Sequence, residues 1–117
     1  DFPVEIARQL IGSNKLIGRS THSLRDINQA EQEGCDYLGV GPVHKTSTKP
    51  NEKVVGLSYV EEASKATTLP WFAIGGVNAS NIKSILTAGA QRIAVVGAIM
   101  NSPNPREAAE ELFEAME

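Results

Sequence analysis

The sequence predicts an α/β protein built on a parallel sheet, and three observations support this prediction. Short apolar segments of strand length alternate with amphipathic segments of helical spacing. The segment over residues 69–74 is almost wholly apolar, as is typical of a strand covered on both faces. The clusters of glycine and polar residues all follow an apolar segment, which places them at the carboxyl edge of a parallel sheet. We therefore expect a helix followed by four strand–helix units.

The first elements are a helix, a strand and a second helix. Residues 3–12 have apolar side chains on one helical face, a proline in the first turn and a glycine at the end. A strand is expected over residues 15–19. Hydroxyl side chains at residues 20–23 can then cap a helix that ends at Gly34.

The second strand, residues 37–41, leads into the most informative stretch of the chain. Pro42 has no amide hydrogen to donate to a ladder, so the chain must leave the sheet there. The following loop runs to Gly56, about fifteen residues, and loops of this length usually bind ligands. Its hydroxyl side chains and Lys49 suit an anion such as phosphate or pyrophosphate. A merely solvated polar loop is the alternative, and we expect the loop to be mobile when empty.

The second half of the chain repeats this pattern. Residues 58–61 resemble a capping box that opens a helix through Ala66, and the strand over residues 69–74 follows. Gly75 and Gly76 then permit backbone amides to approach an oxyanion, with Asn78 as the cap of the next helix. A tight strand-to-helix turn is the structural alternative. The fourth strand is expected over residues 93–96, ahead of Gly97, and the last helix starts between Ser102 and Pro105.

Composition limits the classes of function. The chain has 117 residues, 41% of them hydrophobic, which suits a single domain over residues 1–117. Its net charge of −3 argues against a nucleic acid partner. Cys35, the one cysteine, fits a reducing compartment such as the cytoplasm and is expected to be a packed side chain. We see no signal peptide or long apolar span and expect no membrane partner; because the first residue is Asp1, we expect a fragment or a processed product.

Four segments of the sequence carry a resemblance to a known family. They read Gly-Arg-Ser-Thr-His over residues 18–22, Asp-Tyr-Leu-Gly-Val-Gly-Pro-Val-His-Lys-Thr-Ser-Thr-Lys-Pro over 36–50, Ala-Ile-Gly-Gly-Val over 73–77 and Ala-Val-Val-Gly-Ala-Ile over 94–99. Together they closely resemble thiamine-phosphate synthase, a (β/α)8 TIM-barrel enzyme. The resemblance covers about the second half of that barrel and implies that the chain supplies strands five to eight.

The resemblance implies an activity and a set of site residues. The family condenses hydroxymethylpyrimidine diphosphate with hydroxyethylthiazole phosphate, giving thiamine phosphate and pyrophosphate, and it uses Mg²⁺. Departure of the pyrophosphate calls for stabilisation of negative charge more than for an acid or a base. By resemblance, Asp1 binds Mg²⁺, and Ser20 and Lys49 are the catalytic contacts to the pyrophosphate. The thiazole phosphate site would comprise Thr46, Thr48, Gly76, Val96 and Gly97.

Two alternatives stay open. A thiazole tautomerase of the same fold uses a histidine at the position of His22 for proton transfer, but sequences of that kind lack the Thr-x-Thr-Lys segment. For His22 itself we expect a packed or capping histidine. The other alternative is a half barrel that binds phosphate without catalysis.

The missing part of the barrel bears on both activity and assembly. In the family, residues that grip the pyrimidine diphosphate precede the segment matched here, so we expect the isolated chain to be nearly inactive. A half barrel would also leave two sheet edges and an inner face uncovered. We therefore expect a homo-oligomer, with a dimer completing the barrel.

Overall fold

The computed structural model describes residues 2–117, and it confirms the predicted parallel α/β arrangement. The four strands pair in chain order and all pairs are parallel. The elements are α1 (Val4–Ile11), β1 (Gly18–Thr21), α2 (Leu24–Gln32), β2 (Tyr37–Val40), α3 (Gly56–Ala66), β3 (Trp71–Ile74), α4 (Ile82–Thr87), β4 (Ile93–Ala94), α5 (Gly97–Met100) and α6 (Pro105–Ala115).

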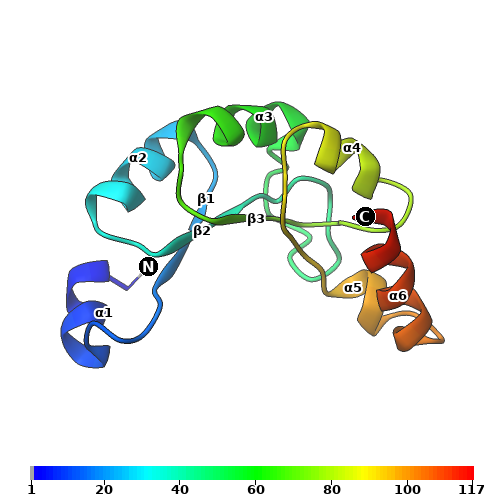
Figure 1. The fold of residues 1–117 in the computed structure, drawn as a ribbon, viewed down its shortest axis with the longest axis horizontal. Helices are drawn as coiled ribbons and strands as arrows, with labels where there is room; N and C mark the ends of the chain where they lie inside the picture. The colour runs from blue at the N-terminus through cyan, green and yellow to red at the C-terminus, as the bar shows by residue number, and fades with distance from the viewer. Residues whose placement is uncertain (1) are drawn as a thin grey trace.

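The molecule has the form of an arch (Figure 1). Helices α2, α3 and α4 lie along the convex side of the sheet, while α1 stands at one end and α5 and α6 at the other. The segment between β2 and α3 lies on the concave side. The strands are therefore covered by helices on one face only.

The core lies between the sheet and the convex helices, and side-chain alternation along β2 shows why. Leu38 and Val40 point toward the helices and are fully buried, where they join Ile27, Val60 and Ile85. Tyr37, on the opposite face, is 37% exposed and packs edge-on against Phe72 at a centroid distance of 5.9 Å. The concave face is thus apolar and partly open to solvent.

Several sequence predictions about element boundaries were wrong, and one element was missed. The second and third strands are Tyr37–Val40 and Trp71–Ile74 rather than residues 37–41 and 69–74. The first strand is Gly18–Thr21 rather than residues 15–19, because its ladder begins where Gly18 pairs with Tyr37. The fourth strand is Ile93–Ala94 rather than residues 93–96, because its partner β3 ends at Ile74, opposite Ala94. The short helix α5 that follows was not predicted.

Helix capping was predicted correctly at one of three places. The Ser23 hydroxyl accepts a hydrogen bond from the Asp26 amide. Asn104, which the sequence analysis did not identify as a cap, accepts one from the Glu107 amide ahead of α6. The capping box at residues 58–61 is wrong, because α3 already begins at Gly56. Asn78 also does not cap α4: its side chain closes a local turn by accepting from the Ser80 and Asn81 amides, and α4 begins after Asn81.

Two further observations concern Cys35 and the helices. Cys35 is buried, as expected of a packed side chain, and burial raises the pKa of its thiol. Within residues 2–117, none of the helices combines the length and apolar character that a membrane crossing requires.

Candidate functional site

The carboxyl ends of all four strands converge on one cavity. Its volume is about 300 Å³, and its lining includes residues 45–49 and Glu52 of the segment between β2 and α3. Residues at the end of each strand or just after it contribute to the lining of the cavity: Ser20 and Thr21 at the end of β1, Gly41 and Pro42 after β2, Gly75 and Gly76 after β3, and Val95 to Gly97 after β4. This convergence is what the position of the polar clusters in the sequence predicted.

The segment between β2 and α3, residues 41–55, is fastened at both ends by backbone hydrogen bonds; we call it the binding loop. The Val43 and His44 amides donate to the carbonyls of Ile74 and Gly75, at 2.9 and 3.0 Å. The Val55 amide donates to the Pro42 carbonyl at 2.9 Å. The binding loop therefore leaves the sheet beside the end of β3 and returns close to its own origin.

The glycine pair after β3 is required by this close approach. Gly75 and Gly76 have φ values of +105° and +65°, in the left-handed region that other residues rarely adopt. A Cβ on Gly76 would lie 2.6 Å from the Lys45 carbonyl oxygen and 2.8 Å from the His44 Cβ. Gly76 thus allows the binding loop to pack directly on the β3–α4 turn.

A buried hydrogen-bond network fixes the end of β1. The Tyr59 hydroxyl lies 2.7 Å from Thr21 Oγ1 and donates to the Ser23 carbonyl at 3.1 Å, while Thr21 Oγ1 donates to the Gly39 carbonyl at 2.8 Å. Burial raises the pKa of the Tyr59 hydroxyl, outweighing its hydrogen bond to Thr21. Because Thr21 is fully buried, this network holds Ser20 in place at the cavity.

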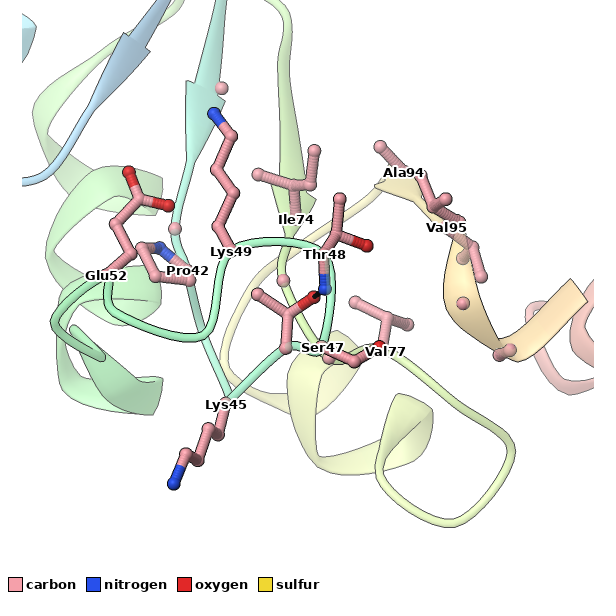
Figure 2. A pocket seen from close by; sticks show the side chains of 18 of the residues that line it. Pro42, Lys45, Ser47, Thr48, Lys49, Glu52, Ile74, Val77, Ala94 and Val95 are labelled. Carbon is pink, nitrogen blue, oxygen red and sulfur yellow. Dashed lines mark hydrogen bonds between the residues drawn. The ribbon is translucent and has the colours of Figure 1, made fainter. Parts of the chain in front are cut away.

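The described residues to which the resemblance gave roles come together at the cavity. Ser20, Thr46, Thr48, Lys49, Gly76, Val96 and Gly97 all line it. Figure 2 shows Lys49 extending along β2, whereas Lys45 points away from the other labelled side chains. The structure juxtaposes these residues; their roles remain predictions.

His22 is neither packed nor capping, so that interpretation was wrong. Its side chain is 45% exposed and lines the cavity, and the adjacent Ser23 is the residue that caps α2. His22 Nε2 lies 3.3 Å from Glu52 Oε1 on the binding loop, and Nδ1 lies 3.8 Å from Asp26 Oδ2. Proximity to two carboxylates from different elements explains why the ring stays at the surface.

Several lining residues had no role from the resemblance, among them Ser47, Glu52 and Asn101. A Cβ on Gly97 would lie 3.4 Å from Asn101 Nδ2 and 3.9 Å from Ser47 Oγ, so both polar side chains flank the amino end of α5. Asn101 lies one turn beyond Gly97, and its amide donates to the Gly97 carbonyl. A sequence prediction of α5 would have placed Asn101 one helical turn from Gly97 and so identified it as a candidate site residue.

The described residues do not form a magnesium site by themselves. Across residues 2–117 there is no group of three His, Cys, Asp or Glu side chains arranged to hold a metal ion. Of the carboxylates described, Glu52 alone lines the cavity, whereas Mg²⁺ prefers several oxygen ligands. The predicted ligand Asp1 lies outside the described residues.

The chemistry of the cavity suits a phosphorylated small molecule. The hydroxyls of Ser20, Thr46, Ser47 and Thr48 are hydrogen-bond donors, and Lys49 contributes a cation. The apolar part of the lining comes from Ile74, Val77 and Val95. Such a mixture can hold both an anionic group and an uncharged ring.

Comparison with known proteins gives consistent results. The family described as thiamine monophosphate synthase matches residues 1–99. Thiamine-phosphate synthases of Prochlorococcus marinus (strain MIT 9313) and Synechococcus sp. (strain WH7803) are 60% and 50% identical to the chain over 116 residues, which is 99% of this chain and 33% of each relative. The chain thus spans about a third of the length of these curated relatives.

A solved structure agrees with the sequence comparisons. Thiamine phosphate pyrophosphorylase from Pyrococcus furiosus superposes with a TM-score of 0.90 at 36% identity, covering 99% of this chain and 55% of that one. A 3-hexulose-6-phosphate synthase, at 23% identity and a TM-score of 0.68, shares the fold alone. The chain therefore belongs to the thiamine monophosphate synthase family.

Proposed function

We propose that the chain is part of a thiamine-phosphate synthase, which joins hydroxymethylpyrimidine diphosphate to hydroxyethylthiazole phosphate and releases pyrophosphate. The observation that carries this proposal is the Thr-x-Thr-Lys segment of the binding loop, which lies at the same cavity as Ser20, Gly76 and Gly97. The relatives named thiamine-phosphate synthase support it, with 60% identity over nearly the whole chain.

The proposed roles follow from the charge that the reaction moves. The bond between the pyrimidine methylene carbon and the diphosphate oxygen breaks, and its electron pair leaves with the pyrophosphate. The thiazole nitrogen then donates its lone pair to the methylene carbon, so neither step needs a general base. Lys49 and Ser20 would stabilise the charge that grows on the departing pyrophosphate, as preorganised donors do. Thr46, Thr48 and the Gly76 and Val96–Gly97 backbone would hold the thiazole phosphate.

Mg²⁺ is the proposed cofactor of the complete enzyme, with Asp1 as one ligand. The chemistry supports this proposal, because a divalent cation would neutralise negative charge on the diphosphate leaving group. Because the described residues supply too few carboxylates, the remaining ligands would come from the part of the longer relatives that the chain does not span.

We propose that the chain supplies strands five to eight of the barrel and is nearly inactive alone. Two assays test the function. The chain is assayed for thiamine phosphate formation with and without the amino-terminal part of the Prochlorococcus relative supplied in trans, and activity is expected only with both parts. Full activity of the chain alone would contradict the assignment to strands five to eight. If no thiamine phosphate formed with the chain alone, with both parts together or with the intact relative, the proposed function would be contradicted.

Pyrophosphate binding by the chain alone tests the site directly. Lys49→Ala is expected to weaken binding about 10- to 100-fold, the range for one charge-assisted hydrogen bond. Lys45→Ala is the matched control, because Lys45 has the same charge and lies in the same loop but points away from the neighbouring site residues. Equal losses for the two variants would show attraction by overall charge instead of a site.

We also propose that two copies of the chain associate through the concave face. Exposed apolar side chains support this: Tyr37, Ile74 and Val96 on the concave side are 37–51% exposed, and Leu10, Met100 and Phe113 at the ends of the arch are 69–73% exposed. A second copy offers the same apolar surface and the same open sheet edges. Light scattering coupled to size exclusion should give a dimer at micromolar concentration, and a stable, well-dispersed monomer would rule this partner out.

A further inference from the structure

We propose that His22 is a positioning residue, which holds the binding loop over the site through Glu52. The inference rests on the proposed function, because the loop it positions carries Thr46, Thr48 and Lys49. It assigns His22 no part in proton transfer.

The middle of the binding loop makes few polar contacts with the rest of the protein. Hydrogen bonds made by residues 45–54 are local: the Thr48 amide donates to Thr46 Oγ1 at 3.2 Å, and the Glu52 amide donates to the Lys49 carbonyl at 3.2 Å. Across the described part of the chain, the contact of Glu52 with His22 is the one polar link from this segment to another element. The end of the loop that carries Lys49 therefore depends on this link.

His22 is a firm point of attachment. Its amide donates to Asp26 Oδ2 at 2.9 Å, and both of its neighbours, Thr21 and Ser23, contact the Tyr59 hydroxyl. Asp26 also faces Nδ1 of the ring at 3.8 Å, which leaves Nε2 directed at Glu52. The histidine is thus oriented from the α2 side before the binding loop meets it.

The link reaches the site through one short turn. The hydrogen bond between the Glu52 amide and the Lys49 carbonyl couples the two residues, so holding Glu52 beside His22 also sets the backbone of Lys49. Because Lys49 and Ser20 line the same cavity, the contact brings the two proposed pyrophosphate ligands together from separate elements. Without it, Lys49 would keep its charge but lose its fixed place, which would weaken binding through entropy.

Hydrogen exchange of the loop amides tests this without any ligand. Exchange at residues 45–53 is measured for the wild type, His22→Ala, Glu52→Ala and the double variant. A partly exposed polar contact between His22 and Glu52 predicts that each single variant exchanges about two- to five-fold faster, and that the double variant exchanges no faster than either. Glu61→Ala is the matched control, since it removes one exposed carboxylate from α3, outside the loop, and should leave loop exchange unchanged.

Further variants separate positioning from general structure. His22→Gln keeps a nitrogen donor for Glu52 and should retain most of the wild-type protection. His22→Leu fills similar space without a donor and should exchange as fast as His22→Ala; protection retained in His22→Leu would show a merely space-filling role and overturn the proposal. Unchanged exchange in both single variants, or effects that multiply in the double variant, would overturn the proposal. A variant that also speeds exchange throughout α2 would show a general loss of folding and overturn it as well.

Pyrophosphate binding then distinguishes the two proposals. If His22 positions Lys49, His22→Ala and Glu52→Ala should each weaken binding by about the same factor as they speed loop exchange. A wild-type chain that binds no pyrophosphate would count against the proposed function, while the exchange results would still decide the role of His22. If loop exchange became faster while the pyrophosphate affinity stayed unchanged, the inference that the position of the loop fixes Lys49 for binding would be overturned.

Discussion

Replacing Gly76 with alanine tests how closely the binding loop packs on the β3–α4 turn. Two separate costs are expected from the structure. The φ value of +65° is left-handed, which costs a residue with a Cβ about 1–2 kcal/mol. The new Cβ would also lie 2.6 Å from the Lys45 carbonyl oxygen and 2.8 Å from the His44 Cβ, and relieving such overpacking costs about 1–3 kcal/mol. The free energy of unfolding should therefore fall by about 2–5 kcal/mol in Gly76→Ala.

Gly34→Ala is the matched control. Gly34 has a similar φ of +81°, but a Cβ there would meet nothing within 4 Å. It should lose only the conformational cost, about 1–2 kcal/mol, and both variants share the same entropic effect on the unfolded chain. The difference between the variants thus isolates the loop contact, at about 1–3 kcal/mol.

Urea denaturation of the wild type and both variants measures this difference. The three proteins are compared at one concentration, because self-association would otherwise shift the midpoints. If Gly76→Ala costs no more than Gly34→Ala, the binding loop does not rest on the glycine turn as the structure has it, and the derived geometry of the phosphate site fails with it.

Three further predictions concern stability. Tyr59→Phe removes the hydroxyl that contacts both Thr21 Oγ1 and the Ser23 carbonyl, and should lower the free energy of unfolding by about 1–3 kcal/mol. A change below the error of urea denaturation would count against the network. Because the pKa of Tyr59 is raised in the fold, the unfolded chain ionises first, so stability should fall as the pH rises past about 10, and Tyr59→Phe should flatten this alkaline loss. Hydrogen bonds from the Arg8 guanidinium and the Ile17 amide lower the pKa of Asp36. The ionised carboxylate therefore stabilises the fold above the ordinary pKa of 3.8, and this stabilisation is lost as the pH falls through the lower folded pKa. Asp36→Asn should remove that part of the loss of stability in acid, and an unchanged acid denaturation curve would refute the assignment.

The fold class, and the edge of the sheet at which the candidate site residues lie, could be predicted from the order of residues in the chain. Apolar segments of strand length, each followed by glycine or polar residues, predict parallel strands with their functional residues at one edge. The reason is physical: side chains that follow parallel strands must meet at the carboxyl end, whatever the details of packing. Ser20, Lys49, Gly76 and Gly97 could therefore be placed together before the structure was known, and the structure brings them to one cavity.

Features that depend on contacts between distant segments could not be predicted from local patterns in the sequence. The ends of β1 and β4 follow from where their neighbours begin and end, so residues 15–17 and 95–96 were assigned to strands in error. The role of Gly76 as a packing surface, the Tyr59 network and the link between His22 and Glu52 each join residues that no local pattern connects. Residue type and spacing fix which groups reach the edge of the sheet, whereas packing between elements decides which of those groups touch.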